Sequence, residues 1–208
     1  PGNDLLDGGT GVDTASYAHA TTGVTVTLGQ VAAQTGAGID TLVSIENLIG
    51  SNYNDTLIGD GGANVINGGL GNDTLIGGLG NDTLIGGAGS DTFLWRQGDV
   101  GRDTVADFKP GTDKLDLSQL LQGESATSAS LDDFLHFKVT VAGTSPVTTI
   151  DISAVAGGAS VQTIDLAGVN LANHYGVTPG AGGVIGGADT ATIINGMLND
   201  HSLKVDTV

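Results

Sequence analysis

Acidic side chains recur every nine residues in the middle of the chain. Asp73, Asp82 and Asp91 mark the interval, and Asp55 and Asn64 fall on the same count upstream. The first 95 residues hold ten acidic side chains and no lysine or arginine. A fold built there has no cation of its own, so either the carboxylates are solvated in a disordered segment or a metal ion supplies the missing charge.

The interval belongs to a nine-residue repeat. The sequence GGLGNDTLI occupies residues 68–76 and again 77–85, and looser copies cover 50–58, 59–67 and 86–94. Every copy has an apolar residue in its eighth position, namely Leu57, Ile66, Leu75, Leu84 and Phe93. Weaker copies supply four more sixth-position aspartates: Asp4 (in 1–7), Asp13 (in 8–16), Asp40 (in 35–43) and Asp103 (in 98–106). Because the first copy is partial, we expect the chain to be a fragment of a longer protein.

Each copy must form a tight turn and a short strand. Glycine accepts positive φ, so Gly-Gly-x-Gly can turn sharply. Residues such as 74–76 favour a strand that buries its eighth-position side chain. Two copies then make one coil of a flattened solenoid, and copies two apart stack as parallel strands about 4.8 Å apart. The sixth positions are thereby paired as Asp55 with Asp73, Asn64 with Asp82, and Asp73 with Asp91.

Such pairs have the spacing of a calcium site. An ion midway between two stacked oxygens lies about 2.4 Å from each, and calcium–oxygen bonds measure about 2.3–2.6 Å. Backbone carbonyls of the turns complete an all-oxygen shell, which suits a hard cation and not zinc or copper. The spacing therefore predicts several Ca²⁺ ions. The turns that would supply carbonyls hold Gly68, Gly69, Gly71, Gly77, Gly78, Gly80, Gly86, Gly87 and Gly89.

Calcium should also decide whether this segment folds. Two carboxylates about 4.8 Å apart repel by roughly 3–4 kcal/mol at an effective dielectric constant of about 20. The core is thin, and the many glycines raise the entropy cost of ordering. We therefore expect disorder without calcium and folding on binding it. A flexible glycine-rich linker and a metal-free solenoid are the alternatives, although a linker would not keep aspartate and an aliphatic residue at a fixed period.

Composition excludes several classes of function. The net charge of -17 argues against nucleic-acid partners, and the absence of cysteine removes disulfide scaffolds and thiolate zinc sites. The sequence has no HExxH, GxSxG or phosphate-binding loop, and its four histidines are scattered (His19, His136, His174 and His201). We expect a monomer without catalytic residues, with any enzyme lying upstream.

The chain divides by composition near residue 106. Residues 1–106 form the repeat region, which a hairpin-like insertion interrupts at about 17–49; Glu46 there is expected to be a solvated or turn residue more readily than a ligand. Residues 107–208 form a β-rich cap that covers the end of the solenoid, with Trp95, Phe108, Phe134 and Phe137 as its apolar residues.

Within the cap, strands are expected at 134–141, 147–152 and 161–166 and a helix at 189–199 with Asp189 or Thr190 as its N-cap, followed by an extended C-terminus. Ser118 could cap a short helix that ends at Leu121. Asp107 and Asp113 are either ligands that close the last calcium sites or surface residues.

These features resemble a known family. The repeats are similar to those of RTX proteins, which Gram-negative bacteria secrete through type I systems. Residues 107–208, with DFKPGTDKLDLSQLL, LDDFLHF and QTIDLAGVNL, resemble the C-terminal region of large LapA-like biofilm adhesins. The resemblance implies an all-β fold, a right-handed parallel β-roll with a C-terminal β-rich cap and a short helix.

The resemblance also implies which atoms bind each ion: two carbonyls and the sixth-position side chain from each of two stacked copies. One set would be Gly69, Gly71 and Asp73 with Gly86, Ala88 and Asp91. A second would be Asp60, Gly62 and Asn64 with Gly77, Leu79 and Asp82. A third would be Ser51, Tyr53 and Asp55 with Gly68, Leu70 and Asp73. Ser51, Tyr53 and Asp60 stand where the pattern has glycine, and Asn64 where it has aspartate.

A role in export follows from the same resemblance. The C-terminal segment would be an uncleaved signal for an ABC transporter, a membrane fusion protein and an outer-membrane channel. The chain would pass unfolded at low cytosolic calcium and fold outside the cell, where it would remain joined to the upstream adhesin at the cell surface. The alternatives are the secretion domain of an exported protease or lipase, and a solenoid that binds ice or another ligand, which the lack of a threonine row in the third position disfavours.

Overall fold

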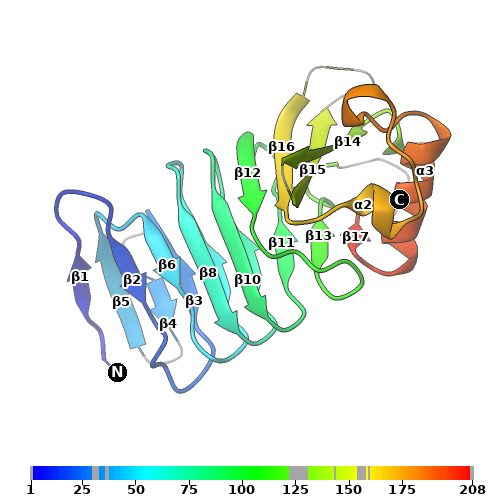
Figure 1. The fold of residues 1–208 in the computed structure, drawn as a ribbon. Coiled ribbons are helices and arrows are strands. Elements are labelled where there is room, and N and C mark those ends of the chain that lie inside the picture. The colour runs from blue at the N-terminus through cyan, green and yellow to red at the C-terminus, as the bar shows by residue number, and fades with distance from the viewer. Residues whose placement is uncertain are drawn as a thin grey trace.

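The fold is described from a computed structural model. It describes residues 2–29, 33–35, 38–121, 131–142, 144–153, 158 and 160–206. The chain forms a parallel β-roll that continues into a C-terminal cap, as Figure 1 shows from the N-terminal end to the cap. The predicted all-β fold with parallel stacked strands is confirmed.

Two sheets form the walls of the roll. One wall stacks β2 (Thr14–Ser16), β6 (Asn47–Ile49), β8 (Val65–Leu70), β10 (Thr83–Ala88) and β12 (Gly101–Val105). The other stacks β3 (Thr25–Thr27), β7 (Thr56–Ile58), β9 (Thr74–Ile76), β11 (Thr92–Leu94) and β13 (Lys114–Asp116). From β6 to β11 the register joins residues 18 apart, as in Leu57 beside Leu75, so two repeats make one coil there.

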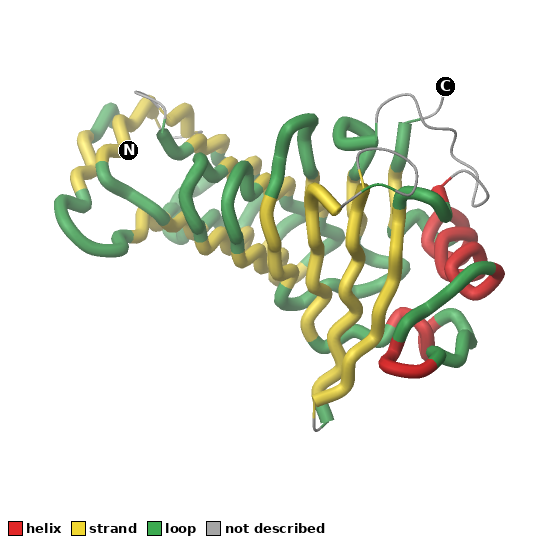
Figure 2. The backbone as a smooth tube through the Cα atoms, turned by 90° about the horizontal axis from the view of Figure 1, so that it is seen from above, coloured by secondary structure: helices red, strands yellow, loops and turns green. Residues whose placement is uncertain are grey.

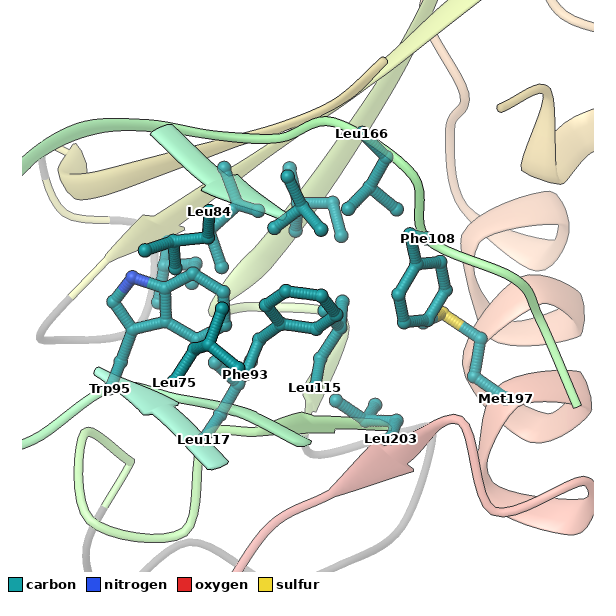
Figure 3. Close-up of a cluster of buried hydrophobic side chains, with 14 of the residues drawn as sticks. Leu75, Leu84, Phe93, Trp95, Phe108, Leu115, Leu117, Leu166, Met197 and Leu203 are labelled. Carbon is teal, nitrogen blue, oxygen red and sulfur yellow. The ribbon is translucent and has the colours of Figure 1, made fainter. Parts of the chain in front are cut away.

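The eighth position of each repeat fills the core. Leu57, Ile66, Leu75, Leu84 and Phe93 have no measurable exposure. Each side chain points inward because strand residues alternate between faces, so the flanking seventh and ninth positions point out of the roll. Near the cap the core widens, and Figure 3 shows Phe93 and Trp95 among the leucines, with Phe108 beside Met197.

The predicted insertion at 17–49 is smaller than expected. β1 (Leu5–Asp7), β5 (Gly38–Val43) and β4 (Ala33–Thr35) form a separate three-stranded sheet, in which β4 and β5 are antiparallel. The strands β3 and β6, which also lie in this stretch, pair in parallel with the walls of the roll. Among the described residues of this stretch, the antiparallel pair of β4 and β5 therefore accounts for the hairpin.

The cap extends one wall and covers the end of the roll. β14 (Leu135–Ala142), β15 (Ser145–Ser153) and β16 (Ser160–Ala167) form an antiparallel meander whose last strand pairs in parallel with β12. Beyond it lie α2 (Leu171–His174), a 3₁₀ turn, η1 (Ala181–Gly183), and α3 (Ala188–Asn199). β17 (Leu203–Lys204) then joins the second wall beside β13. Figure 2 shows the helices gathered on one side of the cap.

The three cap strands and the last helix are confirmed, and two local predictions are wrong. The N-cap of α3 is Gly187, with no side-chain cap, and Thr190 instead donates a hydrogen bond to the Ile185 carbonyl. Ser118 begins no helix; its hydroxyl donates to Asp116 Oδ1 at 2.6 Å, in a turn. Within the described part of the chain, no helix is long and apolar enough to cross a membrane.

Candidate metal centre

The sixth-position residues form two ladders along the turns of the roll. The first ladder is Asp55, Asp73, Asp91 and Asp113; the second is Asp13, Glu46, Asn64, Asp82 and Asp103. In the first, the backbone N–H of Asp55, Asp73 and Asp91 each donates to Oδ1 of the next member, at 2.8, 3.0 and 3.1 Å. In the second, the N–H groups of Asn64 and Asp82 donate in the same way, both at 2.9 Å. The pairing predicted from the nine-residue spacing is confirmed.

The other carboxylate oxygen is left without a partner in four members. Oδ2 of Asp13, Asp73, Asp82 and Asp91 is buried and has no hydrogen-bond donor among the described residues. A buried anionic oxygen without a partner is costly unless a cation or a proton satisfies it. These oxygens therefore fit the calcium predicted from the sequence.

The first glycine of a repeat makes room for that oxygen. A Cβ built on Gly68 would lie 2.3 Å from Oδ2 of Asp73, and one on Gly77 would lie 2.3 Å from Oδ2 of Asp82. No side chain fits in that space, so the glycine is required by the carboxylate of its own repeat.

Burial of these carboxylates shifts their pKa upward. Desolvation raises the pKa of Asp73 to about 7 and that of Asp82 to about 6, and neighbouring carboxylates add to both shifts. Desolvation likewise raises the pKa of Asp91, although Lys109 opposes the shift. Burial in the metal-free roll therefore makes the ionised form of these carboxyls less favourable than it is in water, and a bound divalent cation would oppose that effect.

Several of the predicted carbonyl ligands bond to the neighbouring coil. The Ser51 and Asp60 carbonyls accept from the N–H groups of Leu70 and Leu79, at 3.3 and 3.1 Å, and the Ala88 carbonyl accepts from Gly71 at 2.9 Å. A carbonyl has a second lone pair, so these bonds leave room for a cation. The carbonyl ligand sets stay a prediction. In the described ranges no three acidic or histidine side chains converge, so a cation there would depend on carbonyl oxygens as well as carboxylates.

At the cap end, protein donors satisfy the predicted ligands. Oδ2 of Asp103 accepts from Trp95 Nε1 at 2.7 Å and from Gln162 Nε2 at 2.8 Å. Asp107 binds the N–H groups of Gly86 and Gly87 through its two oxygens, at 2.9 and 2.8 Å. Asp103 and Asp107 thus bond to protein donors, whereas Asp73 and Asp91 each keep one carboxylate oxygen without a partner.

The same ladder hydrogen bond occurs once in the separate sheet of β1, β5 and β4. There the N–H of Asp4 donates to Oδ1 of Asp40 at 3.0 Å.

Two ladder positions were not predicted from the sequence. Glu46 lies in the second ladder, where its Oε2 accepts from the N–H of Asp13 at 2.8 Å. Val24 precedes the first ladder, and its N–H donates to Oδ1 of Asp55 at 2.8 Å. The repeats that contain Glu46 and Val24 lack the glycine pattern. The only sign of them in the sequence is the aliphatic residue two positions later, Leu48 after Glu46 and Val26 after Val24.

Comparisons with known proteins agree with this geometry. Residues 1–15 and 44–75 match the RTX calcium-binding nonapeptide repeat, in 4 copies. This chain carries RTX calcium-binding repeats. Residues 63–146 match the C-terminal domain of peptidase M10, serralysin, so that domain follows and overlaps the RTX repeats. RTX repeats bind calcium, and the two matches together indicate a secreted RTX protein and a type I secretion substrate.

A solved structure also matches part of the chain. It is the solution structure of the AlgE6R3 subunit from the Azotobacter vinelandii mannuronan C5-epimerase, with 27% sequence identity and a TM-score of 0.45. The similarity covers 68% of this chain and 86% of that one. No curated protein matches the RTX chain significantly.

Proposed function

We propose that this RTX segment is a calcium-dependent folding and export region at the C-terminal end of a secreted protein. It is disordered at the low calcium of the cytosol and folds on binding calcium outside the cell. The observation that carries the proposal is the row of buried, unpartnered carboxylate oxygens on Asp73, Asp82 and Asp91. Bound calcium supplies positive charge to these oxygens, which the repeat half cannot supply itself.

The chain's own residues explain why calcium and folding are coupled. The carboxylates of the ladders lie between coils, so the same contacts that bring coils together bring like charges together. The core offers one inward-facing side chain per nine residues, which limits the apolar area that can offset this cost. Binding energy is then folding energy.

Type I export makes use of this coupling. An unfolded chain can enter the channel formed by the ABC transporter, the membrane fusion protein and the outer-membrane channel. Folding of the emerged part outside the cell hinders its return. In this proposal the segment itself carries out no catalysis, and its partners are the secretion machinery and the upstream part of the same protein.

Two kinds of upstream protein are compatible with this role. The resemblance of residues 107–208 to LapA-like adhesins supports a cell-surface adhesin of a Gram-negative bacterium. The match of residues 63–146 to the serralysin C-terminal domain favours the second candidate, an exported enzyme.

Circular dichroism across a calcium titration tests the folding role, with magnesium as the control ion. We expect a calcium-specific rise in β signal that a chelator reverses. A chelator-treated sample with the same spectrum and the same melting temperature as the calcium-loaded one would refute the proposal.

Secretion of a reporter fused to residues 119–208 tests the export role in a cell that carries a type I system. We expect the fusion in the medium only when the transporter is active. A second fusion, to the whole chain with Asp73, Asp82 and Asp91 changed to asparagine, should leave the cell more slowly. An unchanged rate would show that calcium-driven folding does not assist export.

A further inference from the structure

Apart from Glu46, whose repeat contains no glycine, the ladder residues fall into two groups that the second residue of the repeat distinguishes. Those with a free buried oxygen are Asp13, Asp73, Asp82 and Asp91. The second residue of each of their repeats is glycine: Gly9, Gly69, Gly78 and Gly87. In the repeats of Asp55, Asn64, Asp103 and Asp113 the corresponding residue is Ser51, Asp60, Asp99 or Lys109.

Where the second residue is not glycine, its N–H donates a hydrogen bond to the sixth-position side chain of the same repeat in three of the four cases. Ser51 N–H donates to Oδ2 of Asp55, and the Ser51 hydroxyl donates to Oδ1 at 2.8 Å. Asp60 N–H donates to Oδ1 of Asn64 at 3.0 Å.

Lys109 completes these three cases, because its N–H donates to Oδ2 of Asp113 at 2.8 Å. In the fourth case, Asp99 N–H bonds to Arg96 instead, and the indole of Trp95 and the amide of Gln162 satisfy Asp103.

Where the second residue is glycine, the backbone takes another conformation. Gly69, Gly78 and Gly87 have φ of 103°, 99° and 97°, in a region that residues with a side chain rarely adopt. A Cβ on each would lie 2.4, 2.2 or 2.1 Å from a carbonyl oxygen of the preceding coil. Gly9 shares the positive φ, at 79°. A side chain in the second position is thus incompatible with this conformation, which accompanies every free oxygen in the two ladders.

The last coil of the first ladder replaces a further contact. Leu70 and Leu79, in the third position of their repeats, donate N–H groups to carbonyls of the preceding coil. In the last coil the third position is Pro110, which has no N–H, and Lys109 Nζ donates to the Gly87 carbonyl at 2.7 Å instead. The ammonium group of Lys109 therefore contacts a carbonyl of the preceding coil, in place of the N–H that Pro110 lacks.

We propose that the second residue of each repeat marks whether that repeat's carboxylate binds calcium: glycine leaves one oxygen for the ion, and in the repeats with another residue there a protein donor occupies that oxygen. This rests on the proposed calcium binding of the repeats. It assigns calcium to Asp13, Asp73, Asp82 and Asp91. Asp55, Asn64, Asp103 and Asp113 close the ladders without an ion of their own.

An aspartate-to-asparagine series tests the assignment, with bound calcium per chain measured by native mass spectrometry. Asparagine keeps the Oδ1 acceptor of the ladder bond and removes the charge and the second carboxylate oxygen. We expect Asp73→Asn, Asp82→Asn and Asp91→Asn each to lose at least one ion. Asp55→Asn and Asp113→Asn should bind as many as the unaltered chain. An equal loss at Asp55 and Asp73 would overturn the proposal.

A gain-of-site pair tests it from the other side and does not depend on damaging the roll. Ser51→Gly should bind one more ion than the unaltered chain, because glycine at position 51 can take the positive-φ conformation of Gly69, Gly78 and Gly87, in which the N–H of the second residue does not bond to the carboxylate of its own repeat. Ser51→Ala removes the hydroxyl but keeps a side chain in the second position, so its ion number should not change. No gain in Ser51→Gly, or the same gain in both variants, would refute the role of glycine. If the unaltered chain bound no calcium, the proposed function itself would fail, which is a distinguishable result.

Discussion

At the scale of single residues, the first glycine of a repeat and the aspartate five positions later act as one unit. In the repeat 68–76, a methyl group on Gly68 would occupy the position of the Asp73 carboxylate, at 2.3 Å from its Oδ2. A side chain on this glycine should therefore displace the oxygen that we propose as a calcium ligand, although the aspartate is intact.

Gly68→Ala should raise the calcium concentration at the midpoint of folding and destabilise the calcium-loaded roll by about 2 kcal/mol or more, in the range of overpacked buried sites. Gly61→Ala is the matched control, because Gly61 has open space around its Cβ position and no positive φ. Thermal unfolding at fixed calcium compares the two. Equal melting temperatures would show that the carboxylate does not need the space.

The raised pKa values of the ladder predict how calcium binding depends on pH. In the metal-free roll the pKa of Asp73 is about 7 and that of Asp82 about 6, above the unfolded value of 3.8. The folded metal-free chain therefore binds more protons than the unfolded one, so its stability falls as pH rises from about 4 to 7. A roll that stayed folded without calcium would have to release these protons on binding the ion, whereas a disordered chain has ionised carboxylates above about pH 5 and has no protons to release.

We therefore expect the calcium midpoint of folding to change less than about threefold between pH 8 and pH 6, because the disordered chain and the calcium-loaded roll both hold ionised carboxylates in that range. Calorimetry in buffers of different ionisation enthalpy should detect little proton release. A midpoint that rose about tenfold or more would show that calcium binds a roll that is already folded and protonated.

At the scale of elements, the cap closes both walls of the roll with strands that come from late in the sequence. β16 covers the edge of β12, and β17 covers the edge of β13. Trp95 and Gln162 join the second ladder to this closure, since both donate to the buried carboxylate of Asp103. The cap thus provides the polar partners for the ladder end as well as the apolar cover.

Trp95→Phe keeps an aromatic ring in the core but removes one of the two donors to Oδ2 of Asp103, so it should destabilise the calcium-loaded fold by about 1–3 kcal/mol, the net contribution of one buried hydrogen bond to a carboxylate. Gln162→Leu should have a similar effect, and the double variant should be non-additive because both donors serve one oxygen. Chemical unfolding at saturating calcium measures the cycle. Strictly additive effects would indicate that the two side chains act through packing and not through Asp103.

The roll could be predicted from the sequence because its determinants are local. A period of nine fixes the strand register, the buried eighth position and the pairing of Asp73 with Asp91, all of which the structure confirms. Glu46 could not be placed, because its repeat has lost the glycines that mark the turn. The carboxylate of Asp103 accepts a hydrogen bond from Gln162, which is 59 residues away in the sequence. No sequence pattern connects the two residues.

At the scale of the whole molecule, the charge is distributed so that calcium should control the chain's size. The net charge is -17, and the repeat half contains no base before Arg96. A chain of this composition repels itself when its carboxylates are ionised and unpartnered. The buried residues of the cap, such as Ile150, Ile164 and Ile193, belong to the same apolar core as those of the roll, and the sheet of the cap continues directly from the roll through β12.

Small-angle X-ray scattering should therefore show a large calcium-dependent change in radius of gyration. A fully unfolded chain of this length has a radius near 49 Å and a compact one near 17 Å, on the usual scaling with about 208 residues. Because the roll is elongated, we expect the loaded value to lie somewhat above the compact figure, and the chelated value to lie well above the loaded one. Sodium chloride at equal ionic strength is the control, since general screening would compact the chain without a specific ion. A radius that responds equally to sodium and calcium would attribute the compaction to screening and not to ions held between the ladders.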